Sequence, residues 1–84
     1  MKDKILILVY VPAIEEVYDI YIPVVKKVGT IKKLIIQLVE ENSEGNFIDD
    51  GCKSLYDKAT GDKIEDEWFV KESKLKNGSK VILY

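Results

Sequence analysis

Residues 30–42 constrain the fold of this chain more than any other stretch. Four of its apolar side chains recur at the spacing of one α-helix face: Ile31, Leu34, Ile35 and Leu38. Thr30 is a predicted N-cap, because its hydroxyl can accept a free backbone N–H of the first turn. Residues 42–45 contain the Asn, Ser and Gly that commonly end helices. The sequence therefore predicts a helix of about three turns, long enough to cover one face of a small sheet.

The charges on this predicted helix run against its macrodipole. Its N-terminal end carries Lys26, Lys27, Lys32 and Lys33, and its C-terminal end carries Glu40, Glu41 and Glu44. The macrodipole favours the opposite arrangement, by about 0.3–1 kcal/mol for a well-placed charge. Two interpretations follow. Either solvent screens these charges, or the four lysines form a binding patch for an acidic protein partner.

Runs rich in β-branched residues predict strands on both sides of the helix. The predicted strands span residues 4–11, 17–23, 53–57, 63–65 and 81–84, with irregular helix within 66–73. The first two form an antiparallel hairpin, and a right-handed crossover places the last strand parallel to the first. The predicted fold is α+β: a β-grasp roll with a mixed four- to five-stranded sheet and one main helix packed on one face. The alternative is another small α+β sandwich, such as a split βαβ arrangement.

Length and composition predict that residues 1–84 form a single domain. Cys52 is the only cysteine, so no internal disulfide can form and a reducing setting is expected. The sequence shows no signal segment, and its early apolar run is too short to span a bilayer. A cytoplasmic protein without direct membrane insertion is therefore expected.

The residue types that are missing exclude several classes of function. The chain has no Arg and no His, and its net charge is −2. This argues against nucleic-acid binding and removes the commonest general base and nitrogen metal ligand. Cys52 is interpreted as a semi-buried structural thiol, and the acids within residues 57–67 as a solvated edge. No catalytic site, cofactor or metal is expected.

Both faces of the first strand are apolar. One helix covers only one face of a sheet, so the opposite face should be polar unless something else covers it. Either the segments 42–53 and 66–74 cover it, or it exposes an apolar patch, which usually marks an interaction surface. The predicted centre of such a patch consists of Ile7, Val9, Tyr21 and Ile82.

Three segments, residues 18–23, 31–39 and 75–83, resemble the YukD/EsaB-type ubiquitin-like proteins of bacteria. The resemblance implies a ubiquitin-like fold and a role as a small cytoplasmic accessory of type VII (ESAT-6-like, WXG100) secretion. Ubiquitin and the related sulfur carriers end in a flexible Gly-Gly tail that becomes conjugated. Here the sequence ends Val81-Ile82-Leu83-Tyr84, within the predicted last strand, so conjugation is not expected.

The sequence thus favours a non-catalytic protein-binding module, with a membrane secretion component among the candidate partners. The alternative is a PB1-like oligomerisation domain that pairs a basic with an acidic face and forms a weak homo-oligomer. Its acidic pole would lie within residues 56–68, and its basic pole would be Lys4 or the helix lysines. An enzyme or carrier is the third alternative, and the absence of His, Arg and Gly-Gly argues against it.

Overall fold

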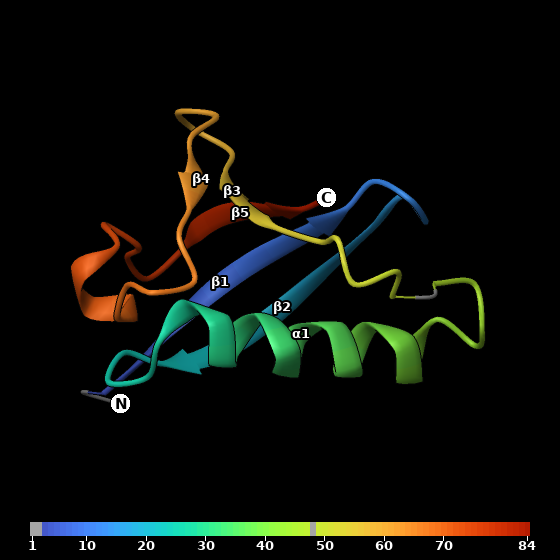
Figure 1. Cartoon of the computed structure of the whole chain (residues 1–84), viewed down its shortest axis with the longest axis horizontal. Helices are drawn as coiled ribbons and strands as arrows, with labels where there is room; N and C mark the ends of the chain where they lie inside the picture. Colours follow the sequence, from blue (N-terminus) through green and yellow to red (C-terminus); the bar gives the residue numbers. More distant parts are fainter. Residues whose placement is uncertain (1–2, 48) are drawn as a thin grey trace.

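The computed structural model describes residues 3–47 and 49–84 and shows one five-stranded sheet crossed by a helix (Figure 1). The elements in chain order are β1 (Lys4–Val11), β2 (Glu16–Pro23), α1 (Val28–Asn42), β3 (Leu55–Asp57), β4 (Lys63–Ile64), the 3₁₀ helix η1 (Val70–Glu72) and β5 (Ser79–Leu83). The strand order is β2-β1-β5-β3-β4. The predicted α+β fold with a mixed sheet and one main helix is confirmed.

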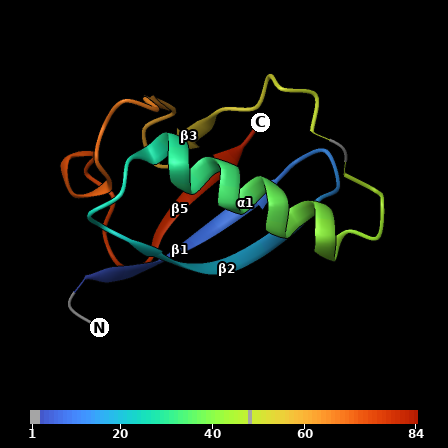
Figure 2. The same ribbon diagram turned by 60° about the horizontal axis from the view of Figure 1, so that its bottom comes forward.

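The centre of the sheet is the pairing of β1 with β5. These strands run parallel, with Val9 opposite Val81 and Tyr10 opposite Ile82, as the crossover rule predicts. β2 pairs antiparallel with β1 on one side, and β3 pairs antiparallel with β5 on the other. Figure 2 shows α1 lying across one face of this sheet.

The core lies between α1 and the face of the sheet that α1 covers. β1 contributes Ile7, Val9 and Val11, and β5 contributes Val81 and Leu83. The buried residues of α1 are Val28, Ile31, Ile35, Ile36 and Val39. Of the four residues of the predicted apolar helix face, Ile31 and Ile35 are buried, whereas Leu34 and Leu38 are 54% and 37% exposed. The helix is rotated so that Ile35 lies at the centre of its buried face. Both leucines therefore lie at the edge of that face, on the side next to β2.

The start of α1 is held by backbone groups from a distant part of the chain. Lys27 is the N-cap residue and its side chain makes no capping bond, so the prediction of Thr30 as N-cap is wrong. The N–H of Val28 donates to the carbonyl of Trp68 at 2.8 Å, and that of Gly29 to the carbonyl of Asp66 at 3.0 Å. These bonds satisfy first-turn N–H groups that would otherwise need a capping side chain.

A tight turn before β5 locks that strand to β1. Gly78 has φ +89°, a conformation that residues with a Cβ rarely adopt. Its N–H donates to the carbonyl of Leu6 at 2.7 Å, and the N–H of Leu6 donates to Oδ1 of Asn77 at 2.8 Å. The predicted Asn-Gly turn is confirmed, and it sets the register of the central strand pair.

Replacing Val9 by alanine should lower the free energy of unfolding by about 2 kcal/mol, because it removes two fully buried methyl groups and leaves a cavity. The matched control is Val25→Ala, at a position that is 55% exposed, where the change should stay within about 0.5 kcal/mol. Urea denaturation of both variants measures the difference. Equal losses would contradict the assignment of Val9 to the core.

Candidate protein-binding surface

The outer sheet face, meaning the face of the sheet turned away from α1, is where the predicted apolar patch has to lie. Ile7 and Val9 do not belong to it, because both are 0% exposed and lie on the helix-facing side. Placing them at the centre of an exposed patch is wrong. Alternation along β1 turns every second side chain toward α1, and the buried set begins at Ile7.

Tyr21 and Ile82, the other two predicted patch residues, do lie on the outer sheet face. Tyr21 is 61% exposed and stands opposite Leu6, whereas Ile82 stands opposite Tyr10 in the centre of the sheet. The apolar and aromatic residues of this face are Leu6, Leu8, Tyr10, Val17, Tyr21, Tyr56 and Ile82. The face thus combines aliphatic side chains with three tyrosines.

The two segments proposed as covers for the outer sheet face pack elsewhere. Phe47, in the segment after α1, is buried in the core that α1 covers. The carbonyls of Asp66 and Trp68 bind the start of α1. Val17, at the end of the outer face nearest the β1–β2 turn, is 56% exposed. Tyr21 is also exposed, and the central residues of the face are half-buried, so neither segment closes the face off from solvent.

Lysines lie on and beside the outer sheet face: Lys80 stands opposite Leu8 on the central strand β5, and Lys58 follows the end of β3. The Nζ of Lys58 lies 5.9 Å from the ring centroid of Tyr10, within the range of a cation–π contact. A shallow hollow of about 200 Å³ lies between these two residues and Leu8, Val17 and Lys80. The ring of Tyr10 can contact an apolar side chain of a partner, and the nearby ammonium groups favour a partner that carries carboxylates next to that side chain.

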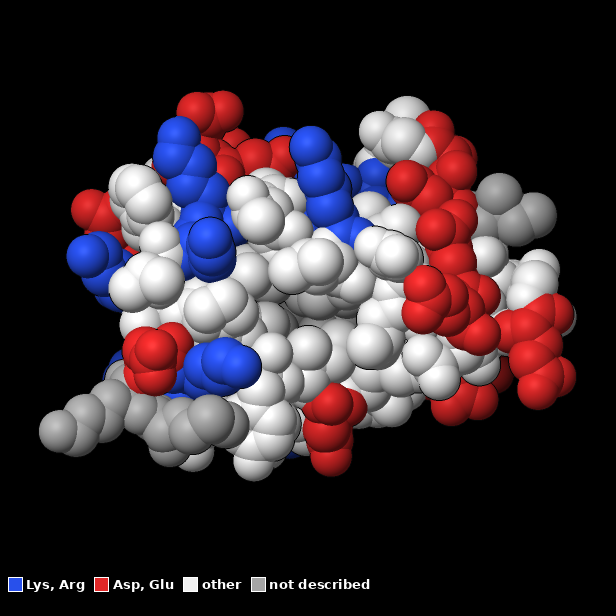
Figure 3. Space-filling view, turned by 90° about the horizontal axis from the view of Figure 1, so that it is seen from below, with Lys and Arg blue, Asp and Glu red and all other residues white. Residues whose placement is uncertain are grey.

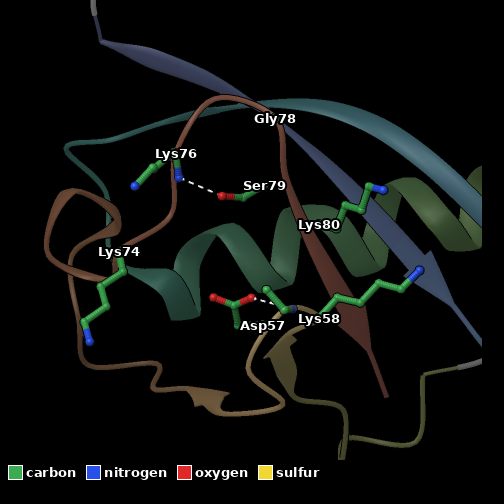
Figure 4. Close-up of a pocket in the computed structure, with 8 residues that line it drawn as sticks. Asp57, Lys58, Lys74, Lys76, Gly78, Ser79 and Lys80 are labelled. Carbon is green, nitrogen blue, oxygen red and sulfur yellow. Dashed lines mark hydrogen bonds between the residues drawn. The ribbon is translucent and has the colours of Figure 1, made fainter.

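A second, larger hollow of about 760 Å³ shares Lys58 and Lys80 with the first (Figure 4). Its lysines are Lys58, Lys74, Lys76 and Lys80. Figure 4 shows Lys74 and Lys76 extending to one side and Lys58 and Lys80 to the other, so their ammonium groups do not converge on one point. This arrangement suits a broad acidic surface better than a small anion. Sequence reasoning missed it because Lys58 lies far along the chain from the others.

The four predicted helix lysines have different surroundings. The Nζ of Lys32 is 2.8 Å from Oδ2 of Asp66, and the Nζ of Lys27 lies 5.8 Å from the ring centroid of Phe69. These two side chains therefore hold segment 66–69 against α1. Lys26 and Lys33 are exposed. The binding role of all four lysines stays a prediction.

The acidic residues of the proposed PB1-like pole do not form one separate face. Asp66 contacts Lys32, so one member of the acidic run lies against the proposed basic pole. Asp57 lines the large lysine hollow, and its Oδ1 accepts the N–H of Ala59 at 2.9 Å. Two surfaces that pair between molecules need to lie apart on each molecule, and these residues are interleaved instead.

The thiol differs from its sequence interpretation. Cys52 is exposed rather than semi-buried, and its N–H donates to Oδ1 of Asp50 at 2.9 Å. In residues 3–47 and 49–84, no three His, Cys, Asp or Glu side chains cluster closely enough to hold a metal ion. The same residues include no helix with the length and apolar character needed to cross a membrane.

Comparison with known proteins shows the fold of this chain. No family model matches the sequence, and no curated protein matches it. The structure is similar to the ubiquitin-like domain of an Arabidopsis thaliana protein, with a TM-score of 0.71 and 18% identity over 96% of this chain and 76% of that one. It is similar to Caldiarchaeum subterraneum ubiquitin, with a TM-score of 0.73 and 13% identity over 95% of this chain and 90% of that one.

A third similar structure comes from a secretion system. The match is to a chain of the MycP5-free ESX-5 inner membrane complex, with a TM-score of 0.79 and 10% identity. It covers 98% of this chain and 21% of that one, so the likeness concerns one part of a much longer chain. At these identities the comparisons establish the fold alone. The protein has the ubiquitin-like β-grasp fold.

Replacing Lys32 by alanine should lower the free energy of unfolding by up to about 1 kcal/mol, because the ion pair with Asp66 is partly exposed. The loss should shrink in high salt, which screens the pair. Lys33→Ala, one residue further along α1, is the control and should change stability by less than about 0.5 kcal/mol. Urea denaturation at two salt concentrations checks this. Equal losses for both variants would show that the ion pair does not stabilise the fold.

Proposed function

We propose that this chain is a non-catalytic ubiquitin-like protein-binding module that acts as a single domain in the cytoplasm. Its partner would be a component of a bacterial protein complex, with type VII secretion machinery as the specific candidate. The observation that carries the proposal is the open outer sheet face, where Tyr10, Tyr56 and Ile82 lie side by side on neighbouring strands.

The chemistry of this face suits a protein partner. Tyrosine is enriched in the buried centres of interfaces, because it combines a large apolar ring with a hydroxyl that can bind at the rim. Ile82 lies opposite both Tyr10 and Tyr56, which makes it the centre of the aromatic group. Lys80 lies on the same face, opposite Leu8, and Lys58 lies beside Tyr10. A complementary partner would present an apolar side chain surrounded by carboxylates.

Two independent observations favour a secretion complex as the partner. The sequence segments 18–23, 31–39 and 75–83 resemble the YukD/EsaB-type proteins linked to type VII secretion. The structure is similar to part of a chain in the ESX-5 inner membrane complex. The first rests on residue patterns and the second on the path of the backbone.

Site-specific photocrosslinking in the native cells tests this proposal. A crosslinking residue at Tyr56 should capture a component of a membrane-bound secretion apparatus, identified by mass spectrometry. Adding Ile82→Glu to the same protein should reduce capture by about tenfold or more, because a carboxylate would be buried among the tyrosines. Val25→Glu, at another exposed apolar position, is the control and should leave capture unchanged.

Circular dichroism must show that both glutamate variants remain folded. Equal capture by the wild-type protein and the Ile82→Glu variant would show that the partner does not bind the outer sheet face. Capture of proteins unrelated to secretion, lost in the Ile82→Glu variant, would keep the binding face and overturn the secretion assignment.

A further inference from the structure

The free edge of β2 points to a second interaction surface, separate from the outer sheet face. β2 is the first strand in the order β2-β1-β5-β3-β4, so one side of its backbone has no strand partner in the described sheet. We propose that two copies of this chain pair through their β2 edges, antiparallel and about a two-fold axis, to form a closed homodimer. The proposal goes beyond the binding function above and does not depend on it.

The hydrogen-bond pattern shows which backbone groups of β2 face the free edge. The N–H of Val24 donates to the carbonyl of Asp3 at 2.9 Å, which makes these two residues a hydrogen-bonded pair. Bonded and non-bonded pairs alternate along an antiparallel ladder. The backbone groups of Val17, Asp19 and Tyr21 therefore point away from β1. They form a ready template for a further strand.

The position of Pro23 is consistent with this assignment of outward-pointing backbone groups in β2. It is paired with Lys4 and falls at a non-bonded position, so its missing N–H costs the β1–β2 ladder nothing. The N–H of Leu6, paired with Tyr21, likewise donates to Asn77 and not to β2.

An apolar groove runs beside this edge, between β2 and α1. Its volume is about 310 Å³, and the side chains of Ile20, Leu34 and Leu38 are among those that line it. Leu34 and Leu38 are the two helix residues that the core leaves exposed. Figure 3 views the molecule from this side and shows an uncharged hollow strip. A strand added to β2 would cover these apolar side chains.

The two ends of the groove carry opposite charge. β2 and α1 run in opposite directions (Figure 1), so the Pro23 end of β2 lies beside the lysine-bearing start of α1. At the other end, Glu16 from the start of β2 and Glu44 from beyond α1 line one hollow. Figure 3 shows acidic residues alone at the end beyond α1, and most of the lysines, with some acidic residues among them, toward the other end.

This polarity selects a second copy as the occupant. Antiparallel pairing reverses the second molecule, so the lysine end of each groove meets the acidic end of the other. A uniformly acidic peptide would meet like charge at Glu16 and Glu41. The arrangement also gives a role to the helix charges, which oppose the macrodipole within one copy but are matched across the two-fold axis.

The charge of Asp19 restricts the register of the pairing. A two-fold axis at Asp19 would set two carboxylates directly opposite each other, which is unfavourable. Moving the axis to Ile20 places Asp19 opposite Tyr21 of the second copy and pairs their outward backbone groups, whereas Val17 then stands opposite Pro23, which has no N–H to donate. Ile20 then meets Ile20 of the second copy on the side of the sheet that carries the groove.

Analytical ultracentrifugation from micromolar to millimolar protein tests the proposal. We expect a monomer–dimer equilibrium that stops at the dimer and weakens with added salt. Asp19→Pro should weaken dimerisation by about tenfold or more, because it removes an outward N–H at a position equivalent to Pro23. The matched control is Ile82→Glu, which alters the outer sheet face and should leave the dimer intact.

A charge exchange gives a second test that does not depend on strand geometry. The Lys26→Glu/Lys33→Glu variant and the Glu41→Lys/Glu44→Lys variant should each be monomeric, because like charges meet across the axis. Mixed together, they should form a heterodimer.

A monomer at every concentration, or a dimer unaffected by Asp19→Pro while that variant stays folded, would overturn the proposal. Open-ended growth with concentration would overturn it in favour of head-to-tail pairing of a basic with an acidic face. None of these results bears on capture through Tyr56, so the two proposals can fail separately.

Discussion

The whole structure depends on the burial of one face of β1 beneath α1. β1 occupies an inner position in the sheet, paired with β2 on one side and β5 on the other, and its inward residues Ile7, Val9 and Val11 are fully buried. Pairing with β1 places β2 and β5 beside it, so that α1 can cover these strands together. Once β1 is oriented in this way, its other face carries Leu6, Leu8 and Tyr10 to the outer side of the sheet. The same alternation thus builds the core and the open surface.

The helix is positioned by contacts far away in the sequence. Its first N–H groups bind the carbonyls of Asp66 and Trp68, and Lys32 on its exposed side binds Asp66. The lysines near the helix start therefore have two kinds of role. Lys27, although exposed, and Lys32 contact the segment before η1, and Lys26 and Lys33 are exposed as well. The four lysines look equivalent in the sequence, but the tertiary structure gives two of them a contact with residues 66–69.

The surface offers two separate places for other molecules. The outer sheet face combines aromatic side chains with the lysines Lys58 and Lys80, which suits a partner that offers both an apolar side chain and carboxylates. The β2 edge and its groove have opposite charges at the two ends, which suits a reversed copy of the same surface. The two places involve different sides of the sheet, so occupation of one leaves the other open.

The sequence alone determined the order of the elements, the parallel pairing of the first and last strands, and the mixed sheet with one helix. Strand propensity, short connections and crossover handedness depend on local pattern and chain connectivity, both of which the sequence shows directly. Only the tertiary structure decided which face of β1 is buried, because residues 5–11 are apolar on both faces and their alternation favours neither. It also decided that Ile36 and Val39 enter the core in place of Leu34 and Leu38, since the helix rotates to fit the sheet beneath it. The lysine hollow around Lys58 and Lys80 and the polarised groove beside β2 arise from residues distant in sequence. No spacing along the chain could reveal them, because folding alone brings those residues together.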